Sequence, residues 1–104
     1  MQDNATGTSF EGLLVQAASG QMPIFELIDL AQRYADIDSK AQAIALYQAW
    51  LERSSSPLVH AVHFNLAVNL VDTQREDEAE KAYRAAIAAN PGFTQAYLNL
   101  SRLL

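Results

Sequence analysis

The chain contains no cysteine, few glycines and prolines, and no cluster of basic residues. The lack of cysteine excludes disulfides, thiol nucleophiles and cysteine-ligated zinc. Seven basic and twelve acidic side chains give a formal net charge of −5. A nucleic-acid ligand requires a positive surface that displaces counterions. The composition therefore predicts no nucleic-acid partner.

Long hydrophobic runs are also missing. No apolar stretch approaches the roughly 20 residues that a bilayer-spanning helix needs. The first ten residues lack the charged and then apolar pattern of a secretory signal. These features predict a cytoplasmic protein with no membrane partner.

What the sequence does contain is helix-forming material. Half of its 104 residues are hydrophobic, and alanine and leucine are abundant, which favours helices throughout the chain. Residues 1–8 are polar without periodicity and are expected to form a disordered tail. Residues 9–22 are expected to hold an N-terminal helix that Ser9 caps and Gly20 ends. Further helices are predicted near 24–36, 40–53, 58–72, 75–89 and 94–104, which makes about six.

Two stretches of this pattern recur at a fixed distance. Leu30-Ala31-x-x-Tyr34 returns as Leu66-Ala67-x-x-Leu70, and Ala43-x-x-x-Tyr47 returns as Ala79-x-x-x-Tyr83, each 36 positions later. Tyr97-x-x-Leu100-Ser101 repeats the first element again. One hairpin cannot bury its apolar stripe alone, so neighbouring hairpins stack. The period predicts an all-α superhelix of stacked antiparallel helical hairpins.

The recurring residues resemble the tetratricopeptide repeat, a helix–turn–helix unit of about 34 residues. The resemblance implies full copies at 24–57 and 60–93, and a first helix of a truncated third copy, or a capping helix, at 94–104. Some positions depart from the family pattern: Leu27 and His63 replace its usual tryptophan, and Asp38 and Gln74 stand where its turn has glycine. Trp50 replaces a small residue and is expected to change how closely the hairpins pack.

The resemblance also implies a concave groove lined by the first helix of each hairpin. Carried over position by position, this groove comprises Phe25, Ile28, Asp29, Gln32 and Asp36, then Ala61, Phe64, Asn65, Val68, Asn69 and Asp72, and finally Gln95, Leu98, Asn99 and Arg102.

Asn65 and Asn99 are equivalent positions in this groove, and Asp29 holds the same place in the first copy. An asparagine offers both a donor and an acceptor, so a ladder of them can hold an extended peptide by its backbone. Such a ladder resembles the repeat region of O-linked N-acetylglucosamine transferases and their bacterial SPINDLY-like relatives. The alternative interpretation is a row of ordinary solvated groove residues.

The charges of the groove predict the kind of partner. Family members that clamp a C-terminal carboxylate use lysines and arginines there, whereas this chain has only Arg102 nearby. Asp29, Asp36 and Asp72 would repel a carboxylate. We therefore expect a neutral to basic extended segment.

No residue pattern indicates catalysis or metal binding. His60 and His63 have a spacing at which two histidines can share a metal, but no third ligand is suitably placed, and packing is the predicted role. The charged run Arg75-Glu76-Asp77-Glu78 suits the solvated start of a helix. No Gly-rich phosphate loop or Ser/His/Asp arrangement appears. We predict no catalytic residue, no metal, no cofactor and no enzyme activity in these 104 residues.

Three functional hypotheses follow, and they are not exclusive. The first is a non-catalytic module that binds a protein or peptide segment in the concave groove. The second is the N-terminal docking or oligomerisation region of a larger glycosyltransferase. The third is self-association through the last helix, whose Tyr97, Leu100, Leu103 and Leu104 are expected to have no covering helix.

Overall fold

The computed structural model describes residues 9–104, and the expected tail at 1–8 lies outside this range. The described chain is entirely helical, so the predicted all-α class is confirmed. Its elements are α1 (Phe10–Ala18), α2 (Ile24–Asp36), α3 (Lys40–Leu51), α4 (Val59–Asp72), α5 (Glu76–Ala89) and α6 (Thr94–Leu103). None of these helices is long and apolar enough to cross a membrane.

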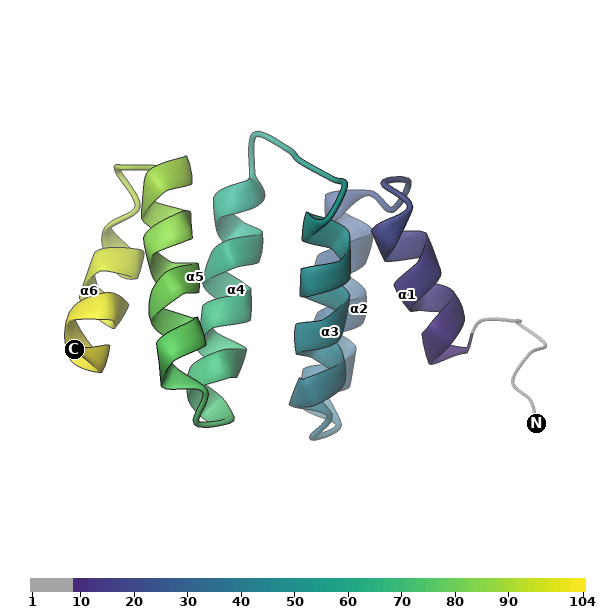
Figure 1. The fold of residues 1–104 in the computed structure, drawn as a ribbon, viewed down its shortest axis with the longest axis horizontal. Coiled ribbons are helices and arrows are strands. Elements are labelled where there is room, and N and C mark those ends of the chain that lie inside the picture. The colour runs from purple at the N-terminus through teal and green to yellow at the C-terminus, as the bar shows by residue number, and fades with distance from the viewer. Residues whose placement is uncertain (1–8) are drawn as a thin grey trace.

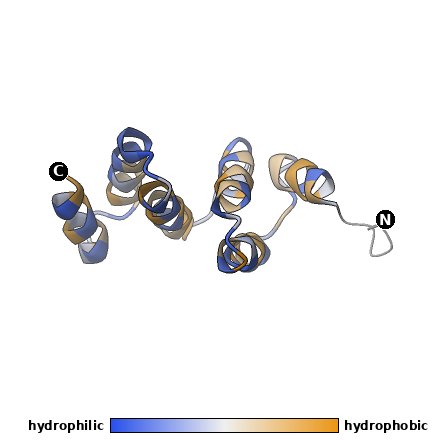
Figure 2. Cartoon of the chain, turned by 90° about the horizontal axis from the view of Figure 1, so that it is seen from below, coloured by the Kyte–Doolittle hydropathy of each residue, from blue (hydrophilic) through white to orange (hydrophobic). Residues whose placement is uncertain are grey.

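The helices form a superhelix of two layers (Figures 1 and 2). One layer contains α1, α3 and α5, and the other contains α2, α4 and α6. The pairs α2–α3 and α4–α5 are antiparallel hairpins, and α3 and α5 each also pack on the helix that follows. The first helix differs, because α1 packs chiefly on α3.

Small and large apolar residues together fill the space between the layers. Ala31, Ala43, Ala67 and Ala79 have no exposed surface. Such small side chains let neighbouring helices approach closely. Larger residues of the same stripes fill the remaining volume, so a single core runs through all six helices.

Trp50 holds α1 and its connection to α2 against the first hairpin. Its side chain is 1% exposed, and its indole N–H donates to the Met22 carbonyl at 2.8 Å. This bond satisfies the one polar group of the tryptophan inside the core. The departure at position 50 therefore serves the packing of the α1–α2 connection on α3.

The N-terminal helix begins after a serine cap and ends before a glycine with positive φ. The Ser9 hydroxyl accepts from the Gly12 N–H at 3.1 Å, which caps the first turn. Gly20 adopts φ 84° just after the helix, a conformation that suits glycine. Pro23 precedes α2 as its N-cap residue.

Asp38 and Gln74 make equivalent turns inside the two hairpins. Both have a left-handed backbone with φ 64°, which explains the glycine usual at this position. Each turn contains the two backbone bonds of a Schellman motif: Ser39 N–H to the Tyr34 carbonyl and Asp38 N–H to Ala35 in the first, Arg75 N–H to Leu70 and Gln74 N–H to Val71 in the second.

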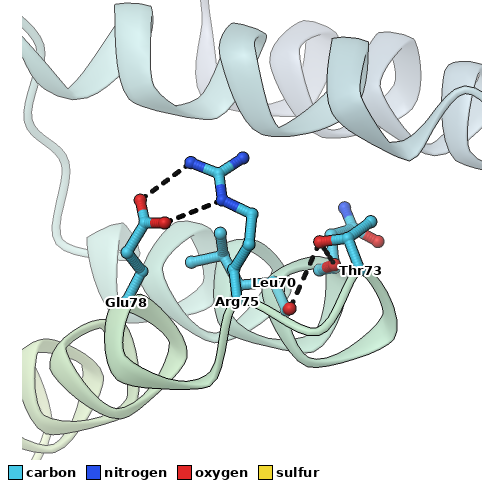
Figure 3. Close-up of polar contacts among 5 residues, drawn as sticks. Leu70, Thr73, Arg75 and Glu78 are labelled. Carbon is cyan, nitrogen blue, oxygen red and sulfur yellow. Dashed lines mark hydrogen bonds and ion pairs between the residues drawn. The ribbon is translucent and has the colours of Figure 1, made fainter.

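Figure 3 shows the second turn. The Thr73 hydroxyl donates to the Leu70 carbonyl at 3.2 Å. The Arg75 guanidinium donates to both carboxylate oxygens of Glu78, at 2.7 and 2.8 Å. This hydrogen-bonded pair lowers the pKa of the Glu78 carboxyl and raises that of Arg75. The charged start of α5 thus makes a local ion pair.

Replacing Gln74 with glycine should raise the free energy of unfolding by about 0.5–1 kcal/mol. Glycine avoids the strain of a Cβ at positive φ, although it loses more backbone entropy on folding. Urea denaturation followed by circular dichroism measures the change. The control Gln48→Gly, at an exposed site inside α3, should lower stability by about 1 kcal/mol. An equal loss in both variants would contradict this role of the turn.

Candidate functional site

Two hollows lie on the α2/α4/α6 layer, one between each pair of successive helices. The first pocket, of about 310 Å³, is lined by Gln32, Ala35, Asp36, Lys40, Tyr47, Phe64, Asn65, Val68, Asn69 and Asp72. The second pocket, of about 380 Å³, is lined by Val68, Val71, Asp72, Glu76, Tyr83, Asn99, Arg102 and Leu103.

The two pockets are built from equivalent residues of successive repeats. Tyr47 in the first pocket corresponds to Tyr83 in the second, 36 positions later, and Asn65 corresponds to Asn99, 34 positions later. Both tyrosines come from the opposite layer and are nearly buried, at 1% and 3% exposure. A phenol from α3 or α5 and an amide from the next helix therefore recur in each pocket.

A family comparison agrees with this duplication. A model described as tetratricopeptide repeat matches residues 28–92 and 65–104. The chain belongs to the tetratricopeptide repeat family. No curated protein and no solved structure matches it. Tetratricopeptide repeats generally serve as protein–protein interaction modules and are typically non-catalytic.

The tyrosine–asparagine pairs link neighbouring repeats. Asn99 Nδ2 donates to the Tyr83 hydroxyl at 3.2 Å, and Asn99 Oδ1 accepts from Gln95 Nε2 at 2.9 Å. Burial raises the pKa of Tyr83, and the Asn99 bond partly offsets this. Burial likewise raises the pKa of Tyr47, and a hydrogen bond with Asn65 partly offsets this increase. Both phenols are therefore protonated at neutral pH and can donate a hydrogen bond.

The predicted groove residues divide into two sets. Lining one or both pockets are Gln32, Asp36, Phe64, Asn65, Val68, Asn69, Asp72, Asn99 and Arg102. Phe25, Ile28, Asp29, Ala61, Gln95 and Leu98 line neither pocket. The exposed carboxylate of Asp29 instead pairs with Arg33 at 2.9 Å, one turn along α2. Asp29, which holds the third position of the predicted ladder, therefore lies outside both pockets, whereas Asn65 and Asn99 each line one.

Packing reduces what two of these residues expose. Asn69 is 8% exposed, so most of its surface is inside the repeat stack. Phe64 is half-buried because its ring packs on Tyr83, with centroids 5.8 Å apart, and on Phe93 at 4.9 Å. Leu98 occupies the position of Phe64 in the next repeat and remains 48% exposed.

Seven pocket residues were not predicted from the sequence as groove residues: Ala35, Lys40, Tyr47, Val71, Glu76, Tyr83 and Leu103. The recurring pattern places Tyr47 and Tyr83 on the apolar stripe, which is correct for their rings but omits their hydroxyls. The signal that could have found them is a polar atom on a core stripe, repeated at the offset of the repeat. A buried phenol needs a partner for that atom.

The last helix is better covered than predicted. The expectation that Leu100 lies on an open face is wrong, because α6 packs on α5 and leaves Leu100 only 8% exposed. Leu103 also packs against the core. Tyr97, Leu98 and Leu104 remain exposed, at 47%, 48% and 73%.

The two histidines lie within packed surroundings. The His60 ring makes an edge contact with Phe93 at 5.2 Å between centroids. His63 is half-buried, and burial lowers its pKa from the usual 6.5. Among residues 9–104, no group of three or more histidine, cysteine or acidic side chains could hold a metal ion.

The lowered pKa of His63 predicts a pH-dependent stability. The unfolded chain takes up a proton at this histidine near pH 6.5, whereas the folded chain does so only at lower pH. The free energy of unfolding should therefore be highest above pH 6.5 and should decrease as pH falls below it. Urea denaturation between pH 7.5 and 5.0 tests this.

The matched variant is His63→Phe, which keeps an aromatic ring at a position where the family usually has one. Its stability should fall less over the same pH range, because the carboxylates that titrate in both proteins cancel in the comparison. Identical pH slopes for the two proteins would contradict the assignment to His63.

Proposed function

We propose that this chain binds an extended peptide segment of a partner protein along the α2/α4/α6 layer, across both pockets. The observation that carries the proposal is the duplicated pocket, with a buried phenol and an amide at matching positions. An extended peptide also repeats its backbone groups along its length. A surface that repeats the same polar pair suits such a ligand.

Each pocket offers polar and apolar contacts to a peptide. The phenolic O–H can donate to a peptide carbonyl. The asparagine amides retain hydrogen-bonding capacity beyond their contacts with tyrosine. Val68 belongs to both pockets, and Phe64 adds an aromatic wall to the first. This combination suits a segment with exposed backbone and small or apolar side chains.

The charges favour a neutral or basic segment. Asp36 and Asp72 belong to the first pocket, and Asp72 and Glu76 to the second. Lys40 and Arg102 supply one cation to each pocket, so carboxylates outnumber cations in both. An acidic peptide would be repelled, and a partner with complementary charge would bind faster and more selectively.

A second candidate is a docking region for a larger glycosyltransferase. It is favoured by the equivalence of Asn65 and Asn99, which resembles the amide ladder of O-linked N-acetylglucosamine transferases. A coding sequence that continues from Leu104 into a large α/β region would support it, whereas a stop codon there would contradict it. The cytoplasmic location stays a prediction.

A third candidate is self-association through α6. It is favoured by the exposed Tyr97, Leu98 and Leu104 on the last helix. Sedimentation analysis over a range of concentrations tests it, and a monomer at high concentration would argue against it.

Replacing Asn65 and Asn99 together with alanine should weaken peptide binding about tenfold. The change removes two amides from the pockets and releases the tyrosines that they contact. Each hydrogen bond contributes roughly 0.5–1.5 kcal/mol. The probe is a peptide selected on the wild-type protein from a random nine-residue phage library, and fluorescence anisotropy measures its affinity.

The control is the double variant Gln16→Ala and Gln48→Ala, which removes two exposed amides from the α1/α3/α5 layer. It should bind as the wild type does. Circular dichroism verifies that both variants are folded. Unchanged affinity in a folded Asn65/Asn99 variant would refute binding through this layer.

A further inference from the structure

Asp72 occupies the boundary between the two pockets and lines both. It is exposed, and among residues 9–104 its carboxylate takes part in no ion pair and accepts no hydrogen bond. By contrast, Arg33 and Arg84 each pair with an acid on their own helix, and Arg75 pairs with Glu78 at the start of α5. The carboxylate of Asp72 is therefore available to a ligand.

The position of Asp72 on its helix is electrostatically unfavourable. It is the last residue of α4, and Asp36 is the last residue of α2. The C-terminal end of a helix carries partial negative charge, which destabilises an acid there. Both acids nevertheless stand at the same place in successive repeats, and both line a pocket. Asp36 accepts from Gln32 Nε2 at 2.9 Å, one turn back on its own helix. Asp72 has no such local partner, and contact with a cationic ligand would offset its unfavourable position.

The Tyr83 hydroxyl is a hydrogen-bond donor in the second pocket that a ligand can use. The Tyr83 side chain is 3% exposed, and its hydroxyl oxygen accepts from Asn99 Nδ2. No hydrogen bond within residues 9–104 uses the hydroxyl proton of Tyr83. Tyr83 lines the second pocket, so an acceptor brought by a ligand, such as a peptide carbonyl, can take this proton.

The negative charge of Asp72 lies close to this hydroxyl. Its field raises the pKa of Tyr83, in addition to the larger effect of burial. A ligand in the second pocket therefore meets a hydrogen-bond donor at the tyrosine and a carboxylate nearby. Glu76 lines the same pocket and adds a second carboxylate.

We propose that the bound segment carries a lysine or arginine whose cation pairs with Asp72, while a backbone carbonyl of the segment accepts from Tyr83. This inference rests on the proposed peptide-binding function and specifies one side chain of the peptide. A basic residue supplies the cationic partner that the Asp72 carboxylate lacks, and a neighbouring peptide group supplies the acceptor for the Tyr83 hydroxyl. Acidic segments are disfavoured at the same point.

The experiment pans a phage library of random nine-residue peptides on the immobilised wild-type protein. The enriched peptides should share one lysine or arginine. A synthetic peptide of this set and its lysine- or arginine-to-glutamine analogue are then compared by fluorescence anisotropy. On the wild type, the analogue should bind about two- to fivefold more weakly, as expected for an exposed ion pair.

The decisive variant is Asp72→Asn, which keeps the shape of the side chain. It should bind the basic peptide and its glutamine analogue equally. Loss of the acid at a helix end does not destabilise the fold, so circular dichroism and urea denaturation should show a folded protein. The control Glu52→Gln makes the same charge change at an exposed site outside both pockets and should keep the wild-type preference.

Tyr83→Phe tests the second contact, because it removes only the hydroxyl. It should weaken the binding of the basic peptide and of its glutamine analogue by the same factor, since both peptides contain the carbonyl. A preference for the basic peptide that persists in Asp72→Asn would overturn the pairing with Asp72. An equal affinity of Tyr83→Phe and the wild type would overturn the carbonyl contact.

Failure of the inference and failure of the proposed function give different results. If the enriched peptides lack a shared basic residue but lose affinity in the Asn65/Asn99 variant, the inference is wrong and the proposed function stands. If no peptide is enriched over a protein-free surface, the proposed function is contradicted, and the inference fails with it.

Discussion

The rest of the structure depends on the stacking of helical hairpins through small side chains. A single hairpin leaves half of its apolar stripe open to water, so each pair becomes stable only when a neighbour covers it. Alanines with no exposed surface, such as Ala31 and Ala67, allow this close approach. The stack sets the distance between equivalent positions, and the two pockets are therefore separated by the same repeat spacing.

The same stacking generates the binding surface. Because a tyrosine of one layer reaches between two helices of the other, its ring belongs to the core and its hydroxyl to a pocket. The Asn99 amide bridges this hydroxyl and Gln95, so it both joins neighbouring repeats and shapes the pocket. The asparagines are thus part of the scaffold as well as candidate ligand contacts. A polar pair that a ligand would use is held in place by the packing that forms the fold.

The two ends of the stack are finished differently. At the start, α1 packs on α3, and the Trp50 indole secures the α1–α2 connection through the Met22 carbonyl. At the other end, α6 covers α5 but exposes Leu98, whose equivalent Phe64 is packed under Phe93. The difference arises because Phe64 is covered by Tyr83 of α5 and by Phe93 of the α5–α6 connection. Tyr97 and Leu98 therefore remain exposed on α6.

The sequence by itself determined the helical class, the period and the residues that form the core. A fixed offset between matching leucines, alanines and tyrosines leaves few other ways to bury them, and the turn positions Asp38 and Gln74 follow from the same register. Only the tertiary structure decided which residues line the pockets. Lys40, Tyr47, Glu76 and Tyr83 come from helices that a groove prediction based on α2, α4 and α6 omits. The burial of Leu100 and Asn69 likewise depended on how neighbouring helices pack. Periodicity records which face of a helix is apolar, whereas the depth of a side chain and its partners depend on contacts between residues distant in the chain.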